Sequence, residues 1–203
     1  IRAGRVTRTQ AAWAAYWFVR YHLGMSGGLV AAFDEAAAAY RGIADEALRA
    51  WTASFFDAEI RPRLRPGAAR ALERHRQAGD RVVLASSTTQ YLAEQVCATW
   101  GLEPGVHSVL EVRDGRLTGG VARLALGPHK ADRLREWATD QGVPLSAMTF
   151  YTDSATDLAL LEQVAEPVVV HPDRRLRRIA RRRGWRIEDW GGRPRSPARA
   201  STA

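Results

Sequence analysis

Cysteine is nearly absent from this chain of 203 residues, which contains only Cys97. A single cysteine cannot form an internal disulfide, and we therefore expect a protein of a reducing compartment. Cys97 lies in an apolar helical pattern with Tyr91, Leu92, Val96 and Trp100. We interpret it as a buried structural thiol rather than as a catalytic nucleophile.

Long apolar runs are also absent. The longest run, residues 11–19, is well short of the roughly 20 residues that a membrane-spanning helix needs. No basic segment followed by an apolar one marks a secretory signal. We expect a cytoplasmic protein with no membrane partner. An interfacial helix around Trp13, Trp17 and Arg20 is the alternative, but burial in a helical core explains these aromatic residues better.

Net positive charge is scarce outside one segment. The net charge is +8, and seven arginines between Arg174 and Arg183 nearly account for it. A nucleic-acid interface would therefore have to rest on this one helix. Leu176 and Ala180 interrupt the arginines, and no aromatic stacking pattern accompanies them. We expect the arginines to cover most sides of a solvated helix, and we expect no nucleic-acid partner.

The chain divides at a connector with two prolines and a glycine, residues 61–67. Apolar residues make up 46% of the chain, enough to bury a sizeable core. Before the connector, residues 1–61 show helical spacing and abundant alanine, and no strand pattern. We predict helices over 29–40 and 45–58 there. The segment 191–203 is rich in Gly, Pro, Ser and Arg, and we expect it to be disordered.

After the connector, strand and helix patterns alternate. We predict strands over 81–85, 148–152, 168–170 and 186–190, the last at a sheet edge, and a hairpin over 109–121 around Asp114-Gly115. Helices are predicted over 68–77, 88–100, 130–141, 157–164 and 174–183. This alternation indicates an α/β fold with a doubly wound parallel sheet in residues 62–190. Its active site would lie at the carboxyl ends of the strands.

Polar residues follow two of these strands. Ser86, Ser87, Thr88 and Thr89 come after the first, where they either cap a helix or bind an anion with its free amides. The segment 153–157 follows the second, and its two aspartates either bind magnesium or cap the next helix. Lys130 begins a helix, where a lysine is ordinarily a solvated surface charge.

Taken together, these residues resemble the second, third and fourth motifs of haloacid dehalogenase-like phosphatases. The order is a hydroxyl after one strand, a lysine about 45 residues later, and Asp-x-x-x-Asp after the next strand. The segments 64–68, 111–119, 153–158 and 171–176 are similar to the phosphoserine phosphatase-like subfamily IB. The resemblance covers about residues 60–190.

The resemblance implies a Rossmann-like core with a helical cap formed by residues 1–61. Ser86 would hold the transferring phosphoryl oxygen, with Ser87 and Thr88 beside it in the substrate site. Lys130 would neutralise charge on the phosphate. Asp153 would bind Mg²⁺, with Asp157 as the second metal-site carboxylate that orients the shell. The implied reaction is hydrolysis of a small phosphorylated metabolite through an aspartyl-phosphate.

The first motif of that family, Asp-x-Asp-x-Thr, is missing, since no Asp-x-Asp occurs in the chain. The whole first strand is missing with it. Because the chain opens at Ile1 in cap-like sequence, we expect that the translated protein begins further upstream. This chain by itself would then be inactive. The alternative is a catalytically inactive relative that serves as a binding or interaction module.

Overall fold

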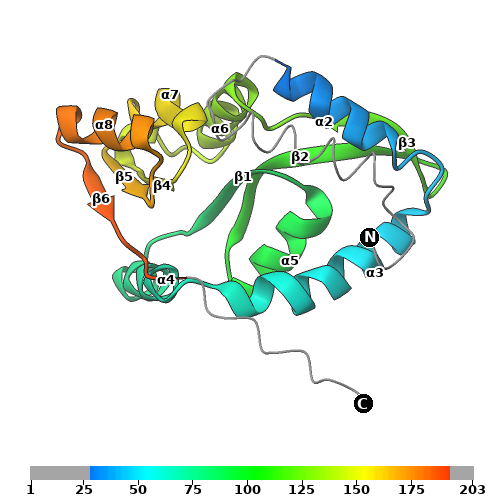
Figure 1. The fold of residues 1–203 in the computed structure, drawn as a ribbon, viewed down its shortest axis with the longest axis horizontal. Coiled ribbons are helices and arrows are strands. Elements are labelled where there is room, and N and C mark those ends of the chain that lie inside the picture. Colours follow the sequence, from blue (N-terminus) through cyan, green and yellow to red (C-terminus); the bar gives the residue numbers. More distant parts are fainter. Residues whose placement is uncertain (1–27, 193–203) are drawn as a thin grey trace.

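The computed structural model describes residues 28–192. The predicted helical pattern around Trp13, Tyr16, Trp17 and Tyr21, and nearly all of the predicted tail, lie outside these residues. Within them, helices and parallel strands alternate after residue 65, and the predicted α/β fold is confirmed. Figure 1 shows α2 and α3 at the end of the molecule that carries the β2–β3 hairpin, with α8 and β6 at the other end.

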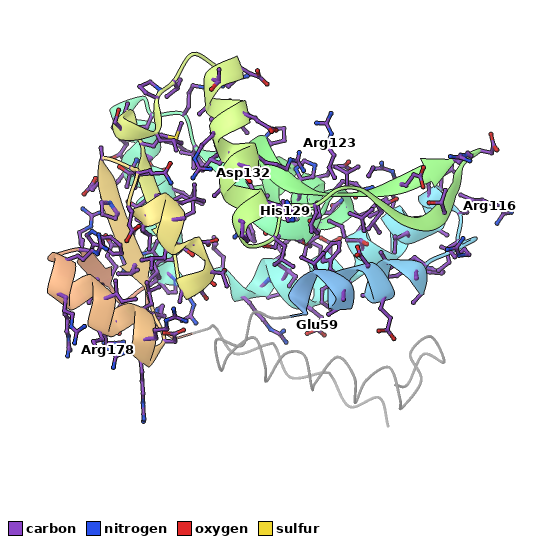
Figure 2. The ribbon with its side chains drawn as sticks, turned by 90° about the horizontal axis from the view of Figure 1, so that it is seen from above. Glu59, Arg116, Arg123, His129, Asp132 and Arg178 are labelled. Carbon is purple, nitrogen blue, oxygen red and sulfur yellow. The ribbon has the colours of Figure 1, made fainter. Side chains whose placement is uncertain are left out.

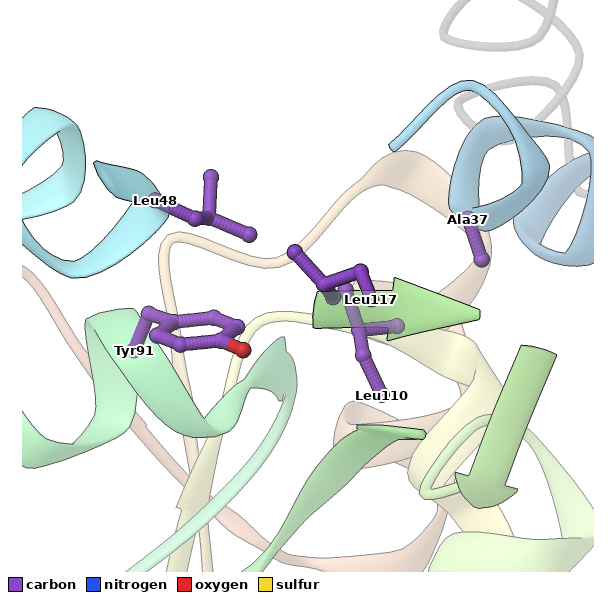
Figure 3. Packing of buried hydrophobic residues seen from close by; sticks show 5 residues of the cluster. All are labelled: Ala37, Leu48, Tyr91, Leu110 and Leu117. Carbon is purple, nitrogen blue, oxygen red and sulfur yellow. The ribbon is translucent and has the colours of Figure 1, made fainter. Parts of the chain in front are cut away.

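The N-terminal part of the described chain is helical. Helix α2 spans Leu29–Ala38 and α3 spans Asp45–Phe55, which continues as a π-helical turn, Phe56–Ile60, and a 3-10 turn, Arg61–Arg63. The link between α2 and α3 is tied to strand β3, because Gly42 donates to Leu117 and Leu117 donates to Ile43. A buried cluster joins both helices to α5, β2 and β3 (Figure 3). Its members are Ala37, Leu48, Tyr91, Leu110 and Leu117.

The first sheet has the order β1-β2-β3. Helix α4, Pro66–Ala78, leads into β1, Val83–Thr89, and α5, Gln90–Trp100, leads into β2, Glu103–Arg113. Strand β2 is parallel to β1 and antiparallel to β3, Arg116–Arg123. The predicted turn at Asp114-Gly115 is confirmed, since both residues have positive φ angles of 51° and 70°.

The second sheet is parallel throughout, in the order β4-β5-β6. Helix α6, Pro128–Asp140, and a short 3-10 turn, Leu145–Ala147, precede β4, Thr149–Thr152. The 3-10 turn Ala155–Asp157 (η4) and α7, Leu158–Leu161, lead to β5, Glu166–Val170. Helix α8, Arg174–Arg183, leads to the edge strand β6, Arg186–Glu188.

Several predicted boundaries were wrong. The first strand continues through Thr89 instead of ending at residue 85, because Thr89 still pairs with Ser108 across a bulge. Helix α5 consequently begins at Gln90, and no side chain caps it. Strand β2 begins at Glu103 rather than at 109, since its first half is the parallel partner of β1. The predicted helix 157–164 is a 3-10 turn followed by the four residues of α7.

The two sheets are held together by helices rather than by strand pairing. A second buried cluster contains Val106, Ala131, Leu134 and Leu160, and both Ala85 of β1 and Phe150 of β4 pack against it. Helix α6 contacts β1, β2 and η4. Within the described residues, however, β1 pairs only with β2 and β4 pairs only with β5. Each sheet therefore has a parallel strand with one open edge.

Candidate active site

A buried ion pair lies at the start of α6. The ammonium of Lys130 is 2.8 Å from Oδ1 of Asp157, and the two side chains are only 8% and 4% exposed. The Thr152 hydroxyl donates to the other carboxylate oxygen, Oδ2, at 2.8 Å. A buried charge is tolerated when it is paired and hydrogen-bonded, as both charges are here. Lys130 is thus not the solvated surface charge that an isolated lysine in this position ordinarily is.

Asp153 occupies the carboxyl end of β4, next to this pair. Its side chain is exposed and forms no hydrogen bond or ion pair with any other described residue. It does not cap the following helical turn, because Ser154 takes that position and accepts from the amide of Thr156. Asp157 forms no side-chain cap for α7 either. The structure therefore separates the two aspartates, with one free carboxylate and one fully engaged.

The hydroxyl residues after the first predicted strand lie on the last part of β1. Ser86 is half-buried, and its Oγ accepts from the amide of Thr88 at 3.2 Å. The carbonyl of Ser87 accepts from the Ser108 hydroxyl. Of the two roles considered for these hydroxyls, capping is not found, because no side chain caps α5. The first residue of that helix, Gln90, is buried, and its side chain bonds the backbone N–H and C=O of Leu110.

The predicted residues fall into two groups. Lys130, Asp153 and Asp157 meet where α6 contacts the η4 turn. Ser86, Ser87 and Thr88 belong to the other sheet, and their described contacts do not include Lys130 or either aspartate. Helix α6 contacts β1 and β2 of the first sheet and the η4 turn that follows β4, so it is the element that relates the two groups.

A pocket of about 490 Å³ opens beside Asp153. His171, at the end of β5, has a left-handed backbone with φ 46° and lines this pocket. Its Nε2 accepts from the amide of Trp190 at 2.9 Å, and Arg65 lies 3.3 Å from the same atom. Neither His171 nor Arg65 was assigned a role from the sequence. The one available signal was their position, since one follows a predicted strand and the other lies in the connector.

A larger cavity, of about 690 Å³, lies between the open edges of the two sheets. It is lined along β1 by residues 83–85 and along β4 by Thr149, Phe150 and Tyr151. Every residue of these two strands is only half-buried. Parallel strands are ordinarily buried and paired. This cavity, which we call the inter-sheet slot, is therefore bordered by two strands with unused backbone donors and acceptors.

The oxygen donors at β4 fit magnesium in part. Mg²⁺ takes oxygen ligands and is commonly bound by one or two carboxylates together with water and phosphate. Asp153 offers an exposed carboxylate with no competing partner. Asp157 is already engaged at both oxygens. No group of three or more His, Cys, Asp or Glu side chains suited to a metal occurs within residues 28–192.

Cys97 and the lengths of the helices in residues 28–192 can be compared with the predictions. Cys97 is buried, as predicted, and burial raises the pKa of its thiol, which disfavours the reactive thiolate. None of the helices in this part of the chain has the length and apolar character needed to cross a membrane.

The sequence of this chain is similar to that of known proteins. A profile described as haloacid dehalogenase-like hydrolase matches residues 1–162. The chain is 41% identical over 132 residues to a protein of Streptomyces azureus named inhibition of morphological differentiation protein, covering 64% of this chain and 48% of that protein. It is 33% identical over 147 residues to a histidinol-phosphatase of Neisseria meningitidis, covering 70% and 66% of the two chains. The chain thus spans about half to two thirds of these curated relatives.

Solved structures agree with the fold. A protein of unknown function from Bordetella pertussis superposes with a TM-score of 0.82 at 28% identity, covering 94% of this chain and 87% of that one. A probable phosphoserine phosphatase from Vibrio cholerae has a TM-score of 0.66 at 19% identity, covering 91% and 54%. At that identity the likeness concerns the fold alone.

Proposed function

Because this chain belongs to the haloacid dehalogenase-like hydrolase family, we propose that the complete protein is a magnesium-dependent phosphomonoester hydrolase. The proposal is carried by the buried pair of Lys130 and Asp157, 2.8 Å apart, beside the free carboxylate of Asp153. A fixed ammonium shielded from water stabilises the charge that develops on phosphoryl oxygens better than a mobile surface lysine does. The arrangement suits phosphoryl transfer, which depends mainly on positioning and electrostatics.

Each described residue has a distinct part in this proposal. Asp157 and Thr152 hold Lys130 at the site, and Lys130 faces the negatively charged phosphate. Ser86, Ser87 and Thr88 supply hydroxyls and amides near the start of α5, where free N–H groups attract an anion. Asp153 is the carboxylate that would bind Mg²⁺. When bound there, the metal supplies Lewis-acid neutralisation of the phosphate oxygens.

The nucleophile is not among the 203 residues, which contain no Asp-x-Asp. We propose that it lies on a strand that fills the inter-sheet slot, as the family resemblance implies. The support is the slot itself, which is bordered by β1 on one side and by β4 on the other. The phosphoryl group would pass from the substrate oxygen to an aspartate of that strand, and then to water.

The substrate is proposed only as a class, a small phosphorylated metabolite. A relative named histidinol-phosphatase supports the class, and a structural neighbour with the same fold is named as a probable phosphoserine phosphatase. They differ in the substrate that their names give, so neither name is transferred to this chain.

The test compares the 203-residue chain with a chain extended by its upstream coding sequence. We expect no magnesium-dependent turnover of p-nitrophenyl phosphate by the shorter chain and clear turnover by the longer one. Robust hydrolysis by the shorter chain would overturn the proposed location of the nucleophile. A folded but inactive longer chain would instead favour the alternative, an inactive relative that acts as a binding module.

Two variants of the extended chain test the proposed roles. Asp153→Asn should abolish the magnesium dependence, whereas Asp140→Asn, an equal charge change at an exposed position of α6, should not. Lys130→Ala should raise the barrier by about 2–4 kcal/mol, the scale of one lost electrostatic donor. A rate loss below about tenfold (~1.4 kcal/mol) would remove Lys130 from the proposed chemistry.

A further inference from the structure

Six arginines of α8 form one continuous exposed face. At 100° per residue, they span an arc of roughly 160°. They are Arg174, Arg175, Arg177, Arg178, Arg181 and Arg182, all exposed. The opposite side of the helix is buried, since Leu176 and Ala180 are both 0% exposed and pack in a cluster with Leu161 and Val169. With Arg183 included, the seven arginines span roughly 240° of the helix, and the remaining side, which carries Leu176 and Ala180, is the buried one.

None of these six arginines forms an ion pair or hydrogen bond through its side chain with another residue of the segment 28–192. The seventh, Arg183, differs. Its guanidinium is 2.6 Å from Glu162 and lies over the ring of Trp185. Figure 2 shows Arg178 on the outer side of α8, at the edge of the molecule. The six side chains, which we call the arginine face, are thus available to a partner.

The arginine face opposes the stability of its own helix. Arg174 and Arg175 lie in the first turn, where the helix dipole disfavours cations. Neighbours three or four residues apart, such as Arg174, Arg178 and Arg181, repel one another. Only the N-cap Asp173, which accepts from the amide of Leu176 at 2.7 Å, relieves this charge within the helix. Arg181 and Arg182 lie in the last turn, where the helix dipole favours cations. The mutual repulsion of the six charges remains, and a polyanion is the partner that would offset it.

The charge of the whole chain is concentrated in the same region. Residues 174–203 contain eleven arginines and two acidic residues, a net charge of +9. Residues 1–173 contain 19 basic and 20 acidic side chains, a net charge of −1. A basic end on an otherwise neutral chain is typical of proteins that bind nucleic acid or anionic surfaces.

The chemistry around the arginine face favours a duplex over the other polyanions. A membrane helix needs an exposed apolar side, but the apolar side of α8 is buried, and the exposed large hydrophobic residues of the described chain lie before β4. Binding of single strands relies on aromatic side chains that stack with bases. The nearest one, Trp185, is half-buried and covered by Arg183. The backbone phosphates of a duplex are therefore the feature that the arginine face can recognise.

We propose that the arginine face binds the phosphate backbone of duplex DNA without reading its base sequence. Successive arginines in the row Arg174, Arg178 and Arg181 are separated by about 6 Å and about 4.5 Å along the helix axis. A duplex carries one phosphate charge per roughly 1.7 Å of its axis, so several guanidiniums can meet phosphates at once. This binding does not depend on the proposed phosphatase chemistry.

The experiment measures fluorescence anisotropy of a labelled 20-base-pair duplex of mixed sequence with the full 203-residue chain, at 50 and 200 mM NaCl. We expect binding at low salt that weakens steeply at high salt. The triple substitution R174Q/R178Q/R181Q should weaken binding at least tenfold and lower the slope of log affinity against log salt by about three. Circular dichroism checks that the folded fractions of the two chains match.

A matched control removes three charges elsewhere. R70Q/R113Q/R123Q changes exposed arginines outside α8 and should weaken binding less than threefold. Equal losses in the two triples would show that net charge alone drives binding and would overturn the proposal. So would the absence of binding by the unsubstituted chain at 50 mM salt. Tighter, α8-dependent capture by phosphatidylserine vesicles, or tighter binding to single-stranded DNA, would overturn the choice of a duplex.

Discussion

Lys130 is a residue whose expected role changes once its burial is known. After Gly127-Pro128-His129, a lysine at the start of a helix has no local reason to be buried. The structure leaves it 6% exposed because Asp157 and the start of α6 meet over the end of β4. A buried charge that has only one charged partner depends strongly on that partner. The pair is therefore a sensitive point for stability as well as the proposed centre of the chemistry.

Breaking this pair from one side should destabilise the fold strongly. Lys130→Met leaves the Asp157 carboxylate buried without its cation, which should cost about 3–5 kcal/mol in unfolding free energy. The double variant Lys130→Met/Asp157→Leu should recover much of that loss, because no buried charge remains. Urea unfolding measures the unfolding free energies of the single and double variants. If the double variant were as unstable as the sum of the single variants, the two side chains would not be coupled as the structure shows.

Tyr91 and Asp45 give a prediction about pH. The Tyr91 hydroxyl donates to Asp45 at 2.6 Å, and this bond is the main reason that the pKa of Asp45 is lowered. A carboxylate with a lowered folded pKa adds stability above its unfolded pKa of about 3.9, and that stability is lost as pH falls through the folded value. Tyr91→Phe should thus cost about 1–2 kcal/mol near neutral pH and much less in acid.

Urea unfolding of Tyr91→Phe at pH 7 and at pH 3 measures this difference. Tyr40→Phe is the matched control, because Tyr40 is 37% exposed and its loss should change neither value appreciably. An equal loss of stability at both pH values would show that Tyr91 acts through packing and not through Asp45.

At the level of single residues, the sequence indicated candidate side chains but not their contacts. The position of Asp153 at a strand end suggested either a metal ligand or a helix cap, whereas Lys130 was a candidate only through the family resemblance. The contact between Lys130 and Asp157 could not be found in this way, because it depends on how α6 packs on the η4 turn. His171 and Arg65 escaped notice because each is bonded to the segment around Trp190, more than 15 residues away in the sequence.

Among the elements, types were predictable and ends were not. Short apolar runs bounded by turn residues predicted every described strand except the first half of β2. That half contains Pro104 and Gly105, which weaken a strand pattern. It is nevertheless extended because it pairs with β1. The end of β1 was missed for the same reason, since the pairing of Thr89 with Ser108 is a long-range contact.

Packing between α4 and the segment that follows β6 gives a prediction about these two elements. The amide of Gly67 donates to the carbonyl of Trp190, and a Cβ at residue 67 would lie 2.4 Å from the Trp190 Cα. Gly67→Ala should therefore cost about 1–3 kcal/mol through overpacking, even though alanine favours helices. Thermal unfolding measures the loss.

Gly79→Ala provides a useful comparison for Gly67. Gly79 ends the same helix with φ 76° and has open space around it, so its substitution should cost only backbone strain, about 1 kcal/mol. If Gly67→Ala were as stable as the unsubstituted chain, the segment around Trp190 would not be packed firmly on α4.

For the whole molecule, the α/β class was predictable, and the described residues divide into two sheets because β1 and β4 share no ladder. Helix α6 and the cluster around Leu134 and Leu160 keep the sheets together. They cover a face of the strands and cannot satisfy the backbone groups at the edges of β1 and β4. The division was therefore readable only through the family resemblance, which places a further strand between these two.

The inter-sheet slot should make this chain less stable than one that fills it. Exposed apolar strand edges favour aggregation, and a buried backbone group left unpaired costs about 1–3 kcal/mol. Since a domain is stable by only about 5–15 kcal/mol in total, several such groups are enough to unfold it. The 203-residue chain should be poorly soluble or loosely packed, and the upstream-extended chain should unfold cooperatively at a higher temperature.

Hydrogen exchange can locate this difference within the molecule. In the 203-residue chain, amides of β1 and β4 should exchange much faster than those of β5, which pairs on both sides and has Val168 and Val169 fully buried. In the extended chain, β1 and β4 should become as protected as β5, whereas β6 at the outer edge should not change. A cooperative transition of the 203-residue chain at the same temperature as the extended one, with β1 and β4 already protected, would contradict this. The sheet would then be complete without a further strand, and a nonenzymatic relative would be the better interpretation of the fold.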